Sequence, residues 1–460
     1  MALPMSSRPL PSADPPVPAM MVPRAMRQIF RTKSIDRLLE ESQDPARRLR
    51  RLLGPWSLIG LGIGAVIGTG IFVLTGTAAA GESVSVPSMV KAPLLDLILH
   101  GSGAVSTFGR PGAGPGISLS FFVTAVVCGF AALCYAELAS MIPVAGSAYT
   151  FAYATLGELI AWMIGWDLIL EYAVSNMAVA VGFSAYFNDL LDSLFGFHLP
   201  AAWSRPPIES GDFTGAIFNL PAFVVLMVLT VLLVRGVRES ARTNNVMVLV
   251  KVAAILIFVF GAAPAIDTAN YQPFLPNGLQ GLLTGSAIVF FTYIGFDSVS
   301  TAAEECRHPQ RDLPIGMIGT LGACAVLYVS VAVVLTGIVN WRELGNAAPV
   351  VNALKALGFT SIRQVVGVGA VVGMISSLMV YQYGQARIWF AMSRDGLLPA
   401  TFSRVHPKYR TPHVSTWVAG LFVGIPAGVW DIGTFADLAS IGTLFAFAVV
   451  SAGVLVLRRT

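Results

Sequence analysis

Long apolar stretches are the feature that most constrains how this chain folds. A helix that spans a lipid bilayer needs about 20 consecutive, mostly apolar residues. Stretches of this kind lie near residues 56–80, 118–141, 157–190, 219–236, 243–265, 281–303, 314–339, 362–392, 414–430 and 433–457. The sequence therefore predicts an all-α polytopic membrane protein with about ten spanning helices.

The composition agrees with a membrane protein and argues against several other classes. Charged residues make up 12% of the 460 residues, against about 25% in a typical soluble domain. The net charge of +4 does not indicate nucleic-acid binding, because the basic residues lie at the edges of the apolar stretches. The five histidines fall between those stretches. We therefore expect no catalytic site, metal or cofactor, and a lipid bilayer as the surroundings.

Lysine and arginine predict the orientation in the membrane, because cytoplasmic segments carry an excess of both. With the N-terminus inside, 22 of the 29 Lys and Arg residues fall in cytoplasmic segments. We expect residues 1–53 to form a cytoplasmic N-terminal segment and residues 54–460 to form the membrane domain. The expected location is the plasma membrane, which is the inner membrane in a bacterium.

The first apolar stretch contains the segment GLGIGAVIGTGIF, residues 60–72, in which five of thirteen residues are glycine. Each glycine costs a helix interior roughly 1 kcal/mol relative to alanine. A dinucleotide-binding loop is excluded, because Ile67 stands where its third glycine is required. Two interpretations remain. The glycines allow close helix packing at GxxxG spacing, or they break the helix so that its N–H groups bind an anion within the membrane.

A second apolar stretch is interrupted in a similar way. In SAIVFFTYIGFDSVSTAAEE, residues 286–305, Gly295 breaks the apolar run beside Asp297. If residues 54–265 and 281–457 form two inverted repeats of five helices each, the two interruptions fall at corresponding positions. Paired interruptions of this kind point to a transport site, whereas packing alone does not require them. This favours the broken-helix interpretation.

Several motifs together resemble one known family. They are GIGAVIGTGIF (62–72), MIPVAGSAYTFAYATLGE (141–158), FFTYIGFDSVSTAAEE (290–305), HPQRDLPIG (308–316) and AMSRDGLLP (391–399). Together they resemble the cationic amino acid transporter branch of the amino acid–polyamine–organocation superfamily, in its bacterial form. The resemblance implies a five-plus-five inverted-repeat core like that of the leucine transporter, with discontinuous helices 1 and 6. The superfamily usually has twelve helices, whereas this chain ends after the tenth stretch.

The resemblance also implies where a substrate binds. The carboxylate of an α-amino acid would meet N–H groups of the helix 1 break, and its ammonium would meet carbonyls of both breaks, with Phe291 as part of a gate. The substrate-binding residues implied are Val66, Ile67, Gly68, Thr69, Gly70, Phe291, Thr292, Ile294 and Gly295. Glu171 is a further candidate, because ionisable groups in spanning helices are often functional. A contact with a water-filled vestibule is the alternative for Glu171.

Lys251 is the only lysine within a spanning stretch. One interpretation is that it snorkels to the interface. Its position eight residues into the stretch, about 12 Å along a helix, is deep for that role. The resemblance instead implies that its ammonium stands where sodium-coupled relatives bind sodium. There it would contact helix 1 carbonyls and the hydroxyls of Ser376 or Ser377, and would couple transport to protons.

The expected function is therefore secondary active amino acid transport, by proton symport and alternating access. Two alternatives stay open: an amino acid exchanger, and a membrane amino acid sensor that does not transport. The expected partners are a small amino acid and protons. Nothing in the sequence indicates an enzyme.

Overall fold

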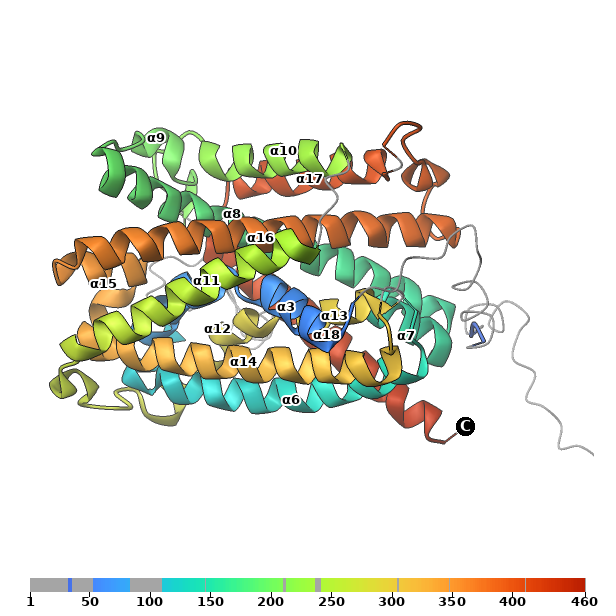
Figure 1. Ribbon diagram of the computed structural model, residues 1–460, viewed down its shortest axis with the longest axis horizontal. Coiled ribbons are helices and arrows are strands. Elements are labelled where there is room, and N and C mark those ends of the chain that lie inside the picture. Colours follow the sequence, from blue (N-terminus) through green and yellow to red (C-terminus); the bar gives the residue numbers. More distant parts are fainter. Residues whose placement is uncertain are drawn as a thin grey trace, which may run out of the picture.

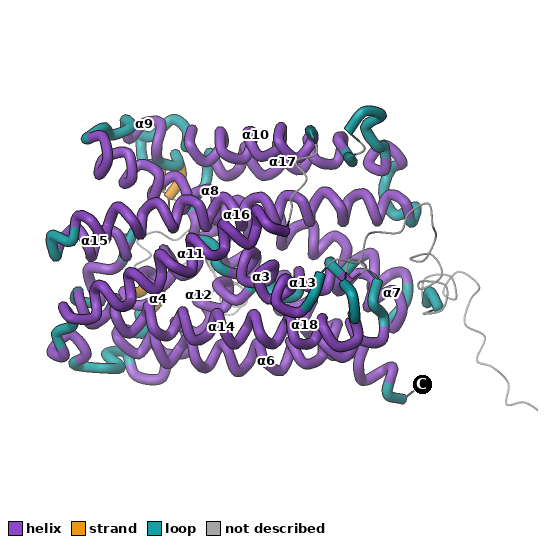
Figure 2. The backbone as a smooth tube through the Cα atoms, in the orientation of Figure 1, coloured by secondary structure: helices purple, strands orange, loops and turns teal. Residues whose placement is uncertain are grey.

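The computed structural model describes residues 32–34, 53–82, 110–144, 146–209, 212–235, 241–303, 306–346, 348–409 and 411–459. The expected cytoplasmic segment 1–53 lies outside these residues, apart from 32–34 and Leu53. Within the described part the protein is almost entirely helical, with two short strand pairs, β1–β2 and β3–β4. Figure 2 shows helices over nearly the whole length of the bundle.

Long helices run side by side along the long axis of the molecule (Figure 1). α6 (Ile117–Met141) packs against α14 (Pro309–Ile338), and α8 (Glu158–Phe195) packs against α16 (Thr360–Arg394). α10 (Leu220–Val234) and α17 (His413–Ala427) form a further pair at one edge of the bundle. The remaining long helices are α11 (Ala241–Ala262) and α18 (Ile432–Leu457).

Two spans are built from shorter pieces in the middle of the bundle. The first consists of α3 (Pro55–Val66), a π-helical turn η1 (Gly70–Leu74) and α4 (Thr75–Ala80). The second consists of α12 (Gly278–Phe290), a 3₁₀ turn η5 (Phe291–Tyr293) and α13 (Ser298–Thr301). Shorter elements lie at the two ends of the bundle: α7 (Ser147–Thr155), α9 (Ala201–Ser204), α15 (Pro349–Ala356), β1 (Gly81–Glu82), β2 (Arg110–Pro111), β3 (Ile208–Glu209) and β4 (Asp212–Phe213).

The helices account for the apolar stretches of the sequence. Among the described residues, seven helices are long and apolar enough to cross a membrane, and an eighth span is the bent pair Pro55–Val66 and Gly70–Ala80. α10 and α17 are shorter apolar helices. The protein is therefore an all-α polytopic membrane protein, as the sequence predicts.

Local sequence signals explain where several helices start and stop. Pro55 and Pro309 open α3 and α14, where the missing N–H of proline costs no hydrogen bond. The Asn219 side chain accepts a hydrogen bond from the Ala222 N–H and caps α10. Gly196 ends α8 with φ +62°, a conformation that glycine adopts without strain.

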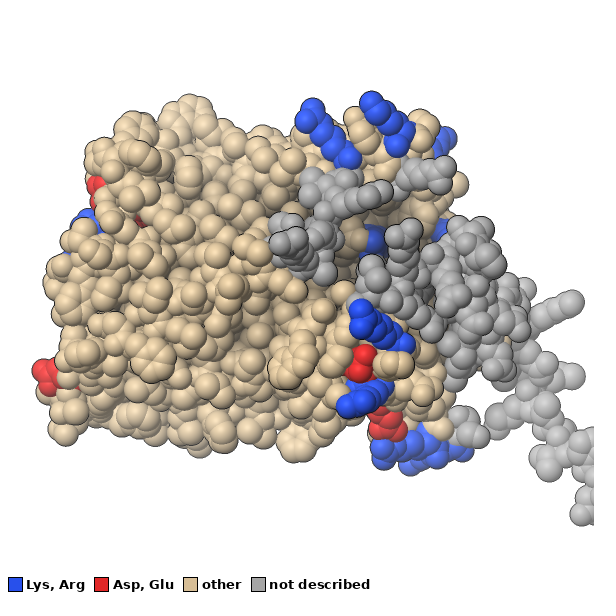
Figure 3. All heavy atoms as spheres, in the orientation of Figure 1, with Lys and Arg blue, Asp and Glu red and all other residues tan. Residues whose placement is uncertain are grey.

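Charged side chains gather at the two ends of the bundle. On the face shown in Figure 3, the flank between the ends is free of charged atoms among the described residues, and most of the basic side chains lie at the end that carries the C-terminus. The uncharged flank exposes large apolar side chains, including Phe130, Phe260 and Val326. Such a surface is stable only in contact with lipid.

Candidate functional site

The glycine-rich segment shows both geometries considered from the sequence, close packing and a break in the helix. A Cβ at Gly60 would lie 2.9 Å from Asn245 Oδ1, and a Cβ at Gly62 would overlap Thr320 of α14. These two glycines therefore allow close packing of α3 against its neighbours. After Val66 the helix breaks, and its axis bends by 50° before Gly70. Gly68 lies within this break.

The second span breaks at the position expected from Gly295. Ile294 leaves the helical conformation with ψ 138°, and Gly295 follows with φ +110°. A side chain disfavours this φ. A Cβ at Gly295 would also lie 3.0 Å from the Tyr381 hydroxyl. Only glycine therefore fits this turn without strain.

The two breaks lie against each other in the core. Tyr328 of α14 places its hydroxyl oxygen 3.1 Å from Val66 O and 2.9 Å from Thr292 O, so one hydroxyl links both breaks. A Cβ on Gly70 would lie 2.6 Å from Thr292 Cγ2. The Tyr381 hydroxyl donates to Ile294 O at 3.1 Å. Residues far apart in the chain thus form one buried centre of backbone carbonyls that lie outside regular helical hydrogen bonding.

The backbone groups of the first break divide into two sets. The Ile67 N–H donates to Ile63 O and the Gly68 N–H to Val66 O, so local acceptors occupy both donors. Thr69 and Gly70 begin the second half of the span, and N–H groups in the first turn of a helix lack a partner within that helix. The donors that the break offers to an anion therefore come from the Thr69–Gly70 side.

The Lys251 ammonium is in direct contact with the first break. Lys251 is fully buried, and its Nζ donates to Gly64 O at 2.8 Å and to Ile67 O at 2.9 Å. The Ser377 hydroxyl of α16 lies 3.1 Å and 3.0 Å from the same two oxygens. This geometry differs from snorkelling, in which the ammonium would reach the interface. Ser376 is also buried on α16.

The site is enclosed by protein. Val66, Phe291, Thr292 and Ile294 are at most 6% exposed, and Ile67 and Thr69 are fully buried. The Thr69 hydroxyl donates to Val179 O of α8 at 3.2 Å, which fixes α8 as one wall. A molecule held between the breaks would therefore be shielded from bulk water.

Glu171 lies on α8, close to Asp297 of the second break and to α18. It is almost fully buried on α8 and its side chain hydrogen-bonds Thr443 of α18. Asp167, one turn earlier on α8, lies close to Gly442 of α18. Asp297 is fully buried, and its Oδ2 accepts from Ser147 at 3.3 Å. These carboxyl groups form an acidic cluster between α18 and the second break.

The sequence did not predict the contacts of several residues of the site. Tyr328 and Tyr381 bond break carbonyls, and Val179 contacts the first break. A tyrosine in an apolar helix gives no sign of which carbonyl its hydroxyl reaches. The adjacent polar pair Ser175–Asn176, within the otherwise apolar centre of α8, was the signal available for that wall.

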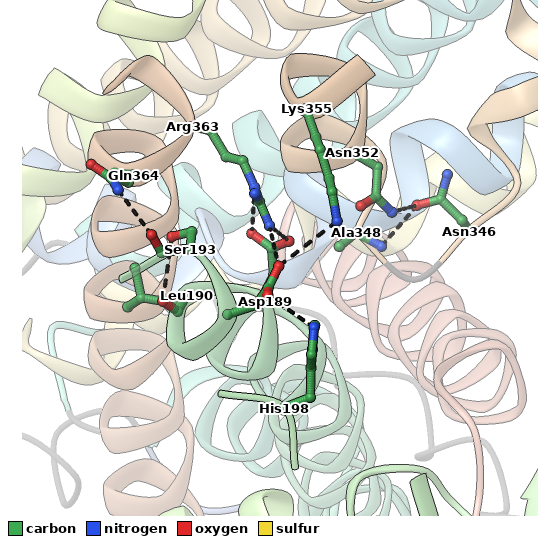
Figure 4. Close-up of polar contacts among 11 residues, drawn as sticks. Asp189, Leu190, Ser193, His198, Asn346, Ala348, Asn352, Lys355, Arg363 and Gln364 are labelled. Carbon is green, nitrogen blue, oxygen red and sulfur yellow. Dashed lines mark hydrogen bonds and ion pairs between the residues drawn. The ribbon is translucent and has the colours of Figure 1, made fainter. Parts of the chain in front are cut away.

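A second charged cluster lies at the end of the bundle opposite the C-terminus (Figure 4). The Arg363 guanidinium forms ion pairs with Asp189 and Asp192 of α8. Asp192 also lies 2.9 Å from His198 Nε2 and 3.7 Å from Lys355 Nζ of α15. The cluster therefore joins α8 to the start of α16 and to α15.

Two discontinuous helices with backbone donors and acceptors at their breaks, in a helical bundle with an apolar flank, are typical of membrane transporters. The chain belongs to the amino acid permease family, whose model matches residues 53–460. It is 43% identical to the methylthioribose transporter of Bacillus subtilis and 46% identical to the branched-chain amino acid permease BcaP of the same species. Each alignment covers 94% of this chain and 86% of the relative.

Plant transporters are also similar to the chain. The chloroplastic cationic amino acid transporter 9 of Arabidopsis thaliana is 38% identical over 416 residues, which cover 89% of this chain and 67% of the relative. The resemblance to the cationic amino acid transporter branch is therefore confirmed. These relatives are transporters and permeases, so the protein is a membrane transporter and not an enzyme.

Proposed function

We propose that this protein is a secondary active amino acid transporter that works as a proton symporter by alternating access. The substrate zwitterion binds between the breaks at Ile67–Thr69 and Ile294–Gly295. Its carboxylate accepts hydrogen bonds from N–H groups near Thr69 and Gly70. Its ammonium donates hydrogen bonds to carbonyls near Val66, Phe291 and Ile294. A zwitterion needs donors at one end and acceptors at the other. Two facing breaks supply both without a charged side chain.

The Lys251 contact carries the proposal of proton coupling. Its ammonium binds Gly64 O and Ile67 O, the carbonyls that end the first half-helix. Protonated Lys251 holds α11 to α3 at the break, where Ser377 of α16 bonds the same two carbonyls. The neutral amine has one donor fewer and holds them less firmly. Exposure first to one side of the membrane and then to the other lets Lys251 load and release a proton.

The arrangement of the two spans supports an inverted-repeat core. The breaks fall in the first and sixth spans, at corresponding positions of the segments 54–265 and 281–457. The end that carries the C-terminus holds most of the basic side chains visible in Figure 3, which favours placing it in the cytoplasm. The protein then lies in the plasma membrane with both termini inside.

Uptake into proteoliposomes tests this function. The purified chain is supplied with a panel of labelled L-amino acids, with an inward proton gradient, with an inward sodium gradient, or with neither. Accumulation that requires only the proton gradient supports symport. Uptake that requires an amino acid preloaded inside identifies an exchanger. Specific binding without uptake identifies a sensor.

Two competitors test how the substrate is held. Methyl esters of the transported amino acids lack the carboxylate and should compete poorly, because each backbone donor left unpaired costs roughly 1–3 kcal/mol. Methyl esters that compete as well as the free amino acids would overturn the binding site. Methylthioribose is included because one relative is named for its transport. Uptake of methylthioribose without uptake of any amino acid would overturn the proposed substrate class.

A further inference from the structure

One carboxylate at the end of the bundle opposite the C-terminus pairs with three basic side chains. Figure 4 shows the side chains of His198, Lys355 and Arg363 directed from three sides toward the acidic groups of α8. His198 Nε2 lies 2.9 Å from Asp192 Oδ1. Lys355 Nζ and Arg363 Nη2 lie 3.7 Å and 3.2 Å from Asp192 Oδ2. Asp192 is therefore shared by the loop after α8, by α15 and by α16.

The charges of this junction balance while His198 is neutral. Arg363 and Lys355 supply two positive charges, and Asp189 and Asp192 supply two negative charges. Protonation of His198 adds a third positive charge against the same two carboxylates. Lys355 is the partner that is most readily displaced, because its side chain is 57% exposed and its contact is the longest. Arg363 is 9% exposed and pairs with both carboxylates.

His198 is open to the solution at this end of the bundle. Its side chain is 66% exposed, and histidine is the side chain whose charge ordinarily changes between about pH 5 and 8. The chain around it is fixed, because the Leu199 N–H donates to Asn188 Oδ1 of α8 at 3.0 Å. A proton taken up from the solution therefore changes the charge beside Asp192.

The displaced partner, Lys355, belongs to a helix that covers the first span. α15 packs against η1, α4 and α16. Its inner face is apolar, with Val350, Val351 and Leu354 at most 1% exposed. A Cβ at Gly76 of α4 would lie 2.6 Å from Pro349 Cβ, so α15 sits tightly on this half of the span. The Lys355–Asp192 pair ties the exposed edge of α15 to α8.

We propose that His198 is a sensor of external pH, which loosens α15 from α8 when it is protonated. The added charge competes with Lys355 for Asp192 and repels the ammonium. α15 then separates more readily from η1 and α4, and the outer solution gains access to the first break. Acid outside thus favours opening on the side from which a proton symporter loads. This inference rests on the proposed function for its orientation, and it assigns a regulatory residue outside the transport site.

Labelling of a cysteine beneath α15 tests the sensor. Val351 is fully buried, so the thiol of Val351→Cys reacts only when α15 lifts. The full-length protein, with its native cysteines replaced by serine, is studied in right-side-out vesicles without substrate and with equal pH on both sides. An impermeant thiol reagent is added at about pH 5.5 and at about pH 7.5, on either side of the usual histidine titration. Each rate is divided by that of Glu343→Cys, an exposed position before α15, which removes the effect of pH on the thiol itself.

The normalised rate should be about 2- to 5-fold higher at the acid pH, a modest change because the ion pair is exposed. His198→Gln keeps a hydrogen-bonding side chain that does not titrate, so its rate should be the same at both pH values. Lys355→Gln removes the tie and should give fast labelling at both. His308→Gln is the matched control, since this exposed histidine precedes α14 at the other end of the bundle. It should keep the wild-type pH dependence.

A normalised rate that does not change with pH in the wild-type background would overturn the sensor. So would a pH dependence that survives His198→Gln. Neither substrate nor a gradient is present, so both outcomes are read even where the uptake assay overturns proton symport. If the thiol of Glu343→Cys cannot be reached from outside, the orientation is overturned, and the sensor of external pH with it.

Discussion

At the scale of single residues, two side chains converge on the same pair of carbonyls. Lys251 and Ser377 come from different helices, and both reach Gly64 O and Ile67 O. A carbonyl oxygen has two lone pairs and can accept from both groups. The end of the first half-helix is thus held by one donor whose charge can change and one whose charge cannot. This contrast allows the two roles to be separated by mutation.

Lys251→Ala should abolish accumulation driven by a pH gradient. The variant loses the group that carries the proton, while Ser377 still holds the two carbonyls. Substrate binding should persist at reduced affinity. Paired binding and uptake measurements in proteoliposomes check this outcome, with Ser377→Ala as a control that keeps proton dependence. Full proton-driven accumulation by Lys251→Ala, or sodium-dependent uptake by the wild type, would contradict the assignment.

Gly70→Leu should abolish substrate binding without preventing insertion. Even a Cβ at this position would lie 2.6 Å from Thr292 Cγ2, so a leucine separates the two breaks. Equilibrium binding of a transported amino acid to the purified protein measures the effect. Gly322→Leu serves as the control, because a Cβ at Gly322 meets nothing within 4 Å. Wild-type affinity in Gly70→Leu would count decisively against the site.

At the scale of elements, the charged cluster in Figure 4 connects α8, α15 and α16 through two kinds of ion pair. The Arg363 and Asp189 side chains are 9% and 13% exposed, whereas the Lys355 side chain is 57% exposed. Ion pairs removed from water become costly to break, and exposed pairs contribute little. The α8–α16 contact should therefore be firm, and the α15 contact weak.

Arg363→Leu should lower the thermal stability of the detergent-solubilised protein much more than Lys355→Ala. Removing one partner of a fully buried ion pair costs about 3–5 kcal/mol. Because the Arg363 side chain is slightly exposed, we expect Arg363→Leu to cost about 3 kcal/mol or less. An exposed pair contributes about 0–1 kcal/mol. Thermal unfolding of both variants in one detergent compares them directly. Equal decreases in the unfolding temperature would show that burial does not make the Arg363 contact stronger than the Lys355 contact.

At the scale of the whole molecule, the face shown in Figure 3 has an uncharged outer flank between two charged ends. The described residues include seven helices of spanning length, one bent pair and the shorter apolar α10 and α17. The ten spans expected from the sequence would place the two ends of the described part on the same side of the membrane. This arrangement agrees with the concentration of basic side chains at the end that carries the C-terminus.

The orientation predicts which loops an impermeant reagent reaches. A single cysteine at Glu343, in the turn before α15, should be labelled from outside intact cells. One at Lys408, in the turn before α17, should be labelled only after the membrane is opened. Both variants are made after the native cysteines, which are free in the structure, have been replaced by serine. Labelling of Lys408→Cys in intact cells would reverse the proposed orientation.

The sequence by itself determined the parts of the protein that depend on local physics. Apolar stretches of bilayer length predicted the helices, since backbone groups in lipid must be satisfied within the helix. Gly295 marked a break because it interrupts an apolar run, and the structure gives it a positive φ that disfavours a side chain. Lys251 was singled out because a lone charge in an apolar helix is costly and needs a partner.

Only the tertiary structure decided which groups meet. Tyr328 links Val66 O to Thr292 O across more than two hundred residues of chain, a contact that no local pattern encodes. The packing of α8 against α18 decides that the buried Glu171 side chain meets Thr443, and its place near a substrate stays a prediction. The position of a residue in a helix sets the direction of its side chain. The packing of the neighbouring helices decides which groups that side chain contacts.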